Sequence, residues 1–107
     1  MPWWAALAVA AASLWSADPA AAQSPAAQRG LTFVRVHCAQ CHAIDKVSAS
    51  PLAVAPPFRD LHRKYPVESL ERPLAEGLTA SPPSMPQFRL DPAQIADVIA
   101  YLKTLER

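Results

Sequence analysis

Two thiols and an imidazole stand close together in one short segment, Cys38-Ala39-Gln40-Cys41-His42. A C-x-x-C-H segment is the sequence mark of covalent haem attachment. The thiols lie about one helical turn apart, so both can form thioether bonds with the two vinyl groups on one edge of a haem. The imidazole of the next residue can then bind the iron. We therefore predict one covalently bound haem, with its iron, held by Cys38, Cys41 and His42.

The same cysteines have other interpretations. A C-x-x-C pair can be a thioredoxin-like dithiol, but that needs a βαβ context, and the chain shows no strand-like alternation. A pair can also be half of a zinc site, which His37 and His62 would have to complete, because no second C-x-x-C pair exists. A chance occurrence of the motif is a third alternative. The chain has 2 cysteines, which leaves none for a structural disulfide and suits an oxidising compartment where haem consumes both.

A haem iron bound by one histidine has a second axial position. Met85 is the only methionine besides Met1, and it lies in the proline-rich segment Ser84-Met85-Pro86. A thioether ligand raises the reduction potential of the iron, and stiff neighbouring prolines reduce the entropy lost in holding it. We predict Met85 as the second iron ligand. The alternatives are a gap-filling Met85 in the core, or ligation by His37, which should project away from the ring, or by His62, which should be solvated.

The first 22 residues have the composition of a secretion signal. An apolar, alanine-rich run extends from Leu7 to Leu14, and Ala20 to Ala22 provide the small residues of a cleavage site. The usual positive charge at the start is missing. An uncleaved anchor is the alternative, although the run is shorter than the ~20 residues of a membrane span. We expect residues 1–22 to be a signal peptide and residues 23–107 to form one periplasmic domain without a membrane span.

A domain of this size has a marginal hydrophobic core, and a haem at its centre would add apolar mass. The chain has 10 basic and 9 acidic side chains, of which only Asp18 lies in residues 1–22. The domain is therefore nearly neutral and has no strong field for nucleic acid or an anionic membrane. The carboxylates are scattered and no glycine-rich phosphate loop is present, so we do not expect an enzyme.

Two helices have clear start signals. The first should begin with Ser24 as N-cap and Pro25 at its first position, and run into the C-x-x-C-H segment. Its apolar face is expected to comprise Ala26, Gly30, Phe33, Val34 and Val36. Glycine weakens a helix, so Gly30 indicates close approach by a second helix.

The last helix should begin at Asp91-Pro92, with Gln94 completing a capping box. Its apolar stripe is Ile95, Val98, Ile99, Leu102 and Leu105. Between the two helices, serines and prolines predict a loop over residues 43–57, followed by a short helical turn over residues 58–65. Residues 66–76 should form another helix that stops at Gly77, and residues 78–90 a stiff loop. The fold class predicted is all-α.

Several segments together resemble a class I cytochrome c of the bacterial periplasmic, monohaem kind. They are Gly30, Cys38 to His42, Ala55-Pro56-Pro57-Phe58, Met85-Pro86-Gln87-Phe88 and Asp97 to Leu102. The resemblance covers about residues 26–105. It implies the cytochrome c fold, in which a few helices wrap around the haem, with the first and last helices crossing near Gly30 beside Tyr101.

The resemblance also implies a proline carbonyl that accepts a hydrogen bond from Nδ1 of the ligating histidine. Pro56 is the better match, with Pro57 as the alternative. The chain departs from the family in having Val34 where an aromatic residue is common, and no tryptophan after residue 15 to hold the haem propionates. Arg59 and Tyr65 are candidates for that role.

The function implied is electron transfer by a diffusible, monomeric carrier between redox partner proteins, a donor and an acceptor. Few lysines are present, so steering by a strongly basic face is not expected. A haem c subunit of a larger oxidoreductase complex is the second hypothesis. A ligand sensor, in which a small gas molecule displaces Met85, is the third.

Overall fold

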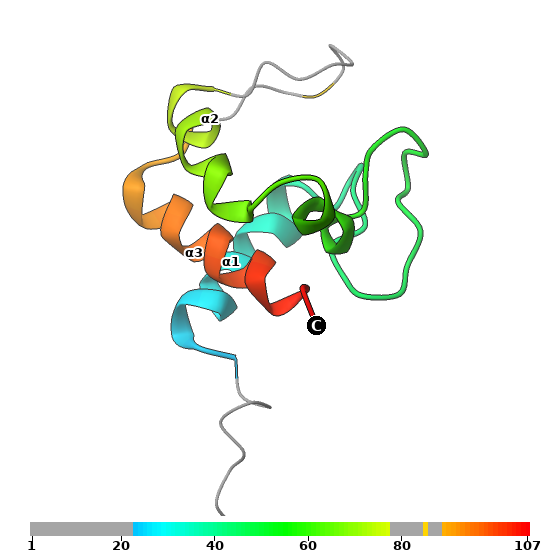
Figure 1. Cartoon of the computed structure of the whole chain (residues 1–107), viewed down its shortest axis with the longest axis horizontal. Helices are drawn as coiled ribbons and strands as arrows, with labels where there is room; N and C mark the ends of the chain where they lie inside the picture. The colour runs from blue at the N-terminus through cyan, green and yellow to red at the C-terminus, as the bar shows by residue number, and fades with distance from the viewer. Residues whose placement is uncertain (1–22, 78–84, 86–88) are drawn as a thin grey trace, which may run out of the picture.

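The computed structural model describes residues 23–77, 85 and 89–107, and the predicted signal peptide lies outside them. The elements, drawn in Figure 1, are α1 (Pro25–His37), the 3₁₀ helices η1 (Phe58–Arg63) and η2 (Val67–Leu70), α2 (Glu71–Glu76) and α3 (Pro92–Thr104). No strand occurs in these described ranges. The predicted all-α class is confirmed.

Both long helices begin at the predicted residues. The Ser24 hydroxyl accepts a hydrogen bond from the Ala27 N–H at 3.1 Å, and Pro25 occupies the first helical position of α1. At α3, the Asp91 carboxylate accepts from the Gln94 N–H at 2.8 Å, and the Gln94 side chain accepts from the Asp91 N–H at 3.1 Å. These bonds satisfy N–H groups that a helix start leaves without an intrahelical partner.

The prediction of one helix over residues 66–76 is wrong. Val67–Leu70 is a 3₁₀ helix, and the α-helical turns begin only at Glu71. Pro73 explains the break, because proline inside a continuous helix clashes with the carbonyl four residues earlier. A new start at Glu71 places Pro73 in the first turn, where its missing N–H costs nothing. As predicted, α2 stops at Gly77, which has a φ of 98°.

Helices α1 and α3 cross (Figure 1), and Gly30 of α1 lies against Asp97 and Tyr101 of α3. A Cβ at this position would stand 2.0 Å from the Asp97 carbonyl oxygen and 2.8 Å from Cβ of Tyr101. Only glycine lets the two backbones approach so closely. Next to the crossing, the Arg29 guanidinium binds both carboxylate oxygens of Asp97 at 3.0 and 3.1 Å. The crossing expected at Gly30 beside Tyr101 is confirmed.

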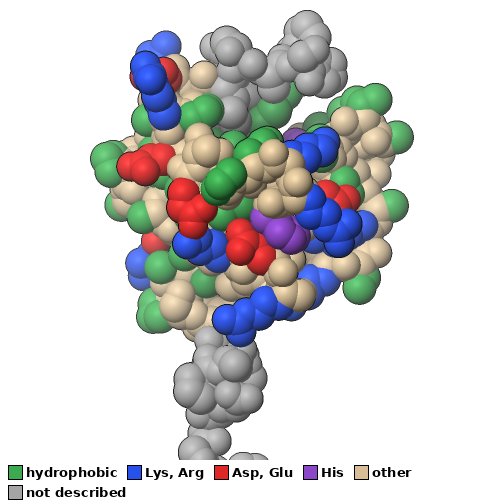
Figure 2. Space-filling model, in the orientation of Figure 1, with side chains coloured by type: hydrophobic (Ala, Val, Ile, Leu, Met, Phe, Trp, Pro, Cys, Tyr) green, Lys and Arg blue, Asp and Glu red, His purple; other side chains and the backbone are tan. Residues whose placement is uncertain are grey.

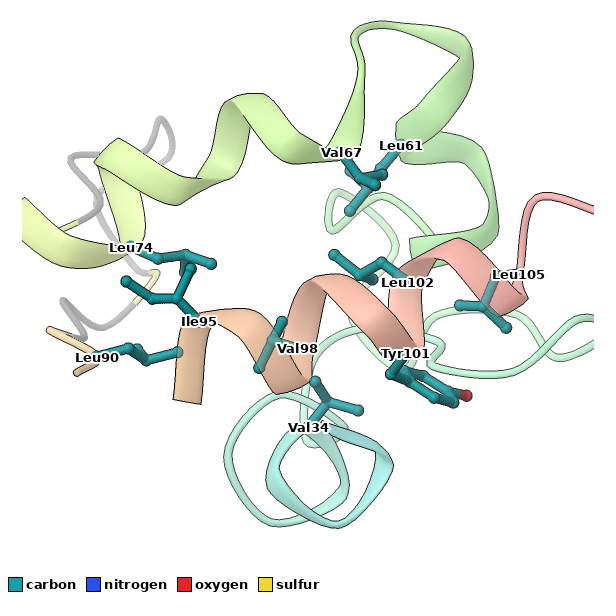
Figure 3. Packing of buried hydrophobic residues seen from close by; sticks show 10 residues of the cluster. All are labelled: Val34, Leu61, Val67, Leu74, Leu90, Ile95, Val98, Tyr101, Leu102 and Leu105. Carbon is teal, nitrogen blue, oxygen red and sulfur yellow. The ribbon is translucent and has the colours of Figure 1, made fainter. Parts of the chain in front are cut away.

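The core is a cluster of mostly aliphatic side chains around α3, with Val34 of α1 on one side of the helix and Leu61, Val67 and Leu74 on the other (Figure 3). It comprises Val34, Leu61, Val67, Leu74, Leu90, Ile95, Val98, Tyr101, Leu102 and Leu105. Val34 lies fully buried where the family often has an aromatic residue. The expected place of Val36 on the buried face was wrong, because its side chain is 70% exposed. Positions two apart on a helix do not share a face, so Val34 and Val36 cannot both point into the core.

The surface carries charges of both signs, which are interspersed on the face shown in Figure 2. Several are paired along the sequence or between elements: Asp60 with Arg63, Arg72 with Glu76, and Glu68 with Lys103. Within the described ranges, no helix has the length and apolar character needed to cross a membrane.

Candidate functional site

The C-x-x-C-H segment follows α1 directly. Cys38 caps the helix, and its N–H donates to the Val34 carbonyl at 2.8 Å. The chain then turns sharply, because the Cys38 carbonyl accepts hydrogen bonds from the N–H groups of Cys41 at 3.2 Å and His42 at 3.0 Å. The two half-buried thiols are not joined in a disulfide. The fold thus brings both thiols and the imidazole to the end of one helix.

The His42 ring is held by one hydrogen bond and one aromatic contact. Nδ1 lies 2.8 Å from the Pro56 carbonyl oxygen, as the family resemblance implied. A carbonyl can only accept, so Nδ1 carries a proton, and in the neutral ring Nε2 then keeps its lone pair. The ring also packs against Phe58, with centroids 4.8 Å apart. A neutral imidazole oriented through its other nitrogen is the usual form of a metal-binding histidine.

Pro57, the alternative acceptor, is used elsewhere. Its carbonyl accepts a hydrogen bond from the Asp60 N–H at 3.0 Å, inside the first turn of η1. Phe58, which the sequence analysis did not single out for the site, starts the same element. The adjacent Pro56-Pro57 sequence was the only signal for it, because each proline fixes its own φ and so restricts the backbone that leads to Phe58.

The loop over residues 43–57 is tied to the site at several points. The Phe58 N–H donates to the Ala43 carbonyl at 2.9 Å and closes the loop at its base. The Ala43 N–H donates to the Ser50 hydroxyl at 3.0 Å, a role that no sequence signal indicated. The Tyr101 hydroxyl of α3 donates to the Ile44 carbonyl at 2.5 Å. These bonds fix the Pro56 carbonyl relative to His42.

Arg59 braces this loop. Its guanidinium donates to the Ser48 carbonyl at 2.7 Å and to the Asp45 carbonyl at 3.4 Å. Hydrogen bonds from the Ser48 hydroxyl and from the N–H groups of Ser48 and Val47, with Arg59 nearby, lower the pKa of Asp45 to about 2. Arg59 and Tyr65 were the two candidate partners of the haem propionates. The Arg59 guanidinium already binds two carbonyl groups of the loop. Tyr65 is partly buried, and this burial raises the pKa of its hydroxyl.

The environment of Cys38 does not suit a redox dithiol. Burial raises the pKa of its thiol to about 11. Catalytic dithiols depend on a lowered thiol pKa, since the thiolate is the reacting species. With no strand in the described ranges, the βαβ context is also missing.

The remaining histidines differ in their surroundings. His37 lies exposed in the last turn of α1, and its ring contacts Phe33 with centroids 4.4 Å apart. The expectation that His62 is fully solvated was wrong, because the residue is half-buried and its Nδ1 is shielded without a hydrogen-bond partner. No group of three or more His, Cys, Asp or Glu side chains within the described residues could hold a metal ion.

Met85 is half-buried, and its neighbours at positions 84 and 86–88 lie outside the described residues. The segment that carries Met85 leaves α2 at Gly77 and returns at Leu90. There the Leu90 N–H donates to the Leu74 carbonyl at 2.8 Å. Ligation by Met85 stays a prediction.

A sequence model of the family described as "Cytochrome c" matches residues 27–106. The chain belongs to the cytochrome c family. It is 32% identical over 103 residues to a protein named "Cytochrome c-553-like" from Synechocystis sp. (strain ATCC 27184 / PCC 6803 / Kazusa), and the match covers 92% of this chain and 91% of the relative. No solved structure gave a significant match. As a class I, monohaem member of this family, the chain has one covalently bound haem c with its iron and transfers electrons with redox partners.

The residues present fit such a group. Two thiols free of a disulfide lie next to an imidazole whose Nδ1 is already bonded to Pro56. This donor set offers two sulfurs for covalent attachment and one nitrogen for the iron.

Proposed function

We propose that the chain is a periplasmic electron carrier whose haem is attached to Cys38 and Cys41 and whose iron is ligated by His42 and Met85. The observation that carries this is the 2.8 Å contact between His42 Nδ1 and the Pro56 carbonyl, which leaves Nε2 for the iron. The Met85 thioether is the matching second donor, since it is the only methionine of residues 23–107.

When bound, the haem supplies an iron that accepts and releases one electron. His42 and Met85 would both hold the iron in either oxidation state, so little would have to rearrange during transfer. The Pro56 carbonyl orients His42 and strengthens it as a donor, and the Met85 sulfur favours the ferrous state and raises the potential. With both residues bound to the iron, no coordination site would remain for a substrate, and we expect no enzymatic activity.

The proposed setting is the periplasm. The composition of residues 1–22 as a signal peptide supports export, and covalent haem attachment suits an oxidising compartment. Residues 23–107 then act as one monomeric domain between a donor and an acceptor protein.

A stable subunit of an oxidoreductase complex is the second candidate. The observation that favours it is the exposure of Val36, Val47 and Val54, whose side chains are 70%, 86% and 65% exposed. Size-exclusion chromatography of a native extract distinguishes the two candidates. A free carrier should elute at an apparent mass below the 11.6 kDa of the full chain, and a subunit should elute together with its larger partner.

The ligation is tested by Met85→Leu, which keeps the bulk of the side chain but removes the sulfur. The ferric variant should lose the near-infrared band of thioether-ligated haem, its ferrous form should bind carbon monoxide, and its potential should fall by about 0.1 V. Val54→Leu, at an exposed position in the loop over residues 43–57, is the control and should leave all three unchanged. A Met85→Leu protein with the wild-type spectrum and potential would show that another residue ligates the iron.

A further inference from the structure

We propose that Gly77 and the backbone hydrogen bond between Leu74 and Leu90 position Met85 on the iron, and we call this pair of features the neck. The proposal rests on the proposed ligation of the iron by Met85. The neck joins the end of α2 to Leu90, two residues before α3, so it brings together the two ends of the sequence segment that contains Met85. Gly77 and Leu90 act through Met85 and are positioning residues.

The hydrogen bond of the neck is anchored in the core. The Leu74 carbonyl belongs to the last turn of α2, where carbonyls lack intrahelical partners, and it accepts from the Leu90 N–H at 2.8 Å. Both side chains are buried, at 8% and 7% exposure. Figure 3 shows them next to Ile95 at the start of α3. The bond therefore lies between buried residues, where a hydrogen bond is stronger than it is in water.

Gly77 sets the direction in which the chain leaves α2. Its φ of 98° and ψ of 123° lie where residues with a Cβ are rarely found. A Cβ built on Gly77 would meet Cγ and Nε of Arg89 at 3.6 Å, which is an ordinary contact. Space is thus available, and the penalty for a larger residue comes from the backbone conformation alone.

The neck matters for Met85 because a shorter closed loop holds its sulfur near the iron at a higher effective concentration. If the neck opens, the loop lengthens and the thioether competes less well with an external ligand. The apparent affinity of that ligand then rises with the fraction of molecules in which Met85 is displaced.

The test uses ferric holoprotein titrated with imidazole, which displaces a weak thioether ligand. Gly77→Ala should lower the apparent dissociation constant for imidazole about tenfold, since strained backbone at position 77 favours the open neck. Ala96→Gly is the control. Ala96 lies on the exposed side of α3, away from the neck, and glycine there destabilises the helix through its low helix propensity. The control thus separates a general loss of stability from an effect on the neck. Its imidazole affinity should stay within about twofold of wild type.

Equal imidazole affinity in Gly77→Ala and Ala96→Gly would overturn the proposal. Absence of the thioether band from the wild-type protein is a separate result, because it removes the proposed ligation itself. Hydrogen exchange of the wild-type holoprotein gives a measurement that needs no variant. The Leu90 amide should exchange as slowly as amides inside α3, and exchange at the rate of an exposed loop amide would contradict a closed neck.

Discussion

The hydrogen bond from His42 to Pro56 shows how one contact defines the chemistry of a side chain. A histidine has two ring nitrogens, and a free imidazole can carry its proton on either. The Pro56 carbonyl, 2.8 Å away, selects the tautomer in which the other nitrogen can bind iron. The sequence motif predicted His42 as a ligand, and the family resemblance implied the proline. The packing of Phe58 on the ring depends on tertiary structure and was not predicted.

Asp45 gives a pH-dependent prediction at the same scale. Its folded pKa is about 2, against an ordinary value of 3.8, because the hydrogen bonds from Ser48 and Val47 favour the carboxylate. A lowered carboxyl pKa adds stability above the ordinary value, and that stability is lost as the pH falls through the folded value. Asp45→Ala should therefore be less stable than wild type at pH 7, with a difference that shrinks between about pH 4 and pH 2.

Urea unfolding followed by circular dichroism at pH 7 and at pH 2 measures the difference in stability between Asp45→Ala and wild type. Lys46→Ala, on the adjacent exposed residue, serves as the control. A destabilisation by Asp45→Ala that is the same at pH 7 and at pH 2 would contradict the assigned role of the carboxylate.

At the scale of elements, local signals predicted where helices start and contacts decided where they meet. Ser24-Pro25 and Asp91-Pro92 mark two helix starts that the structure places at those residues. The break before Glu71 was missed, although Pro73 carried the signal, because the acidic and apolar residues around it suit a continuous helix. We expected Ala26 on the buried face of α1, but the buried alanine is Ala27. The crossing at Gly30 decides which side of α1 faces α3.

The crossing of α1 and α3 should not tolerate a side chain at position 30. A Cβ would lie 2.0 Å from the Asp97 carbonyl oxygen, so the helices would have to separate. Gly30→Ala should lower the free energy of unfolding by about 2 kcal/mol, because overpacking outweighs the better helix propensity of alanine. Urea denaturation measures the change, with Thr32→Ala on the exposed side of α1 as the control. A Gly30→Ala protein as stable as wild type would show that the helices do not pack this closely.

At the scale of the whole molecule, two backbone hydrogen bonds join residues far apart in the sequence next to a small helical core, from Phe58 to Ala43 at 2.9 Å and from Leu90 to Leu74 at 2.8 Å. The first closes the loop that supplies the partner of His42, and the second joins the two ends of the sequence segment that contains Met85. Candidate site residues could be predicted from the sequence, since motif and spacing are local. The sequence could not identify these closures, because they pair backbone groups that any residue type provides.

The small core predicts that folding depends on the haem. Among the described residues, the largest side chains with less than 2% exposure are Val34 and Val67, so little large apolar bulk is fully enclosed. A Cys38→Ala/Cys41→Ala variant cannot attach haem and should melt at least about 20 °C below the holoprotein, as expected when a small domain loses about 4 kcal/mol. Thermal unfolding followed by circular dichroism measures this. Equal melting temperatures would mean that the polypeptide core is sufficient by itself.

The central claim is that both thiols are bonded to one haem. Intact-mass spectrometry of the purified protein, after treatment with an alkylating reagent, tests it most directly. The account predicts the mass of residues 23–107 plus one haem, with no alkyl group added. A colourless protein that has the mass of the polypeptide alone and carries two alkyl groups would contradict it.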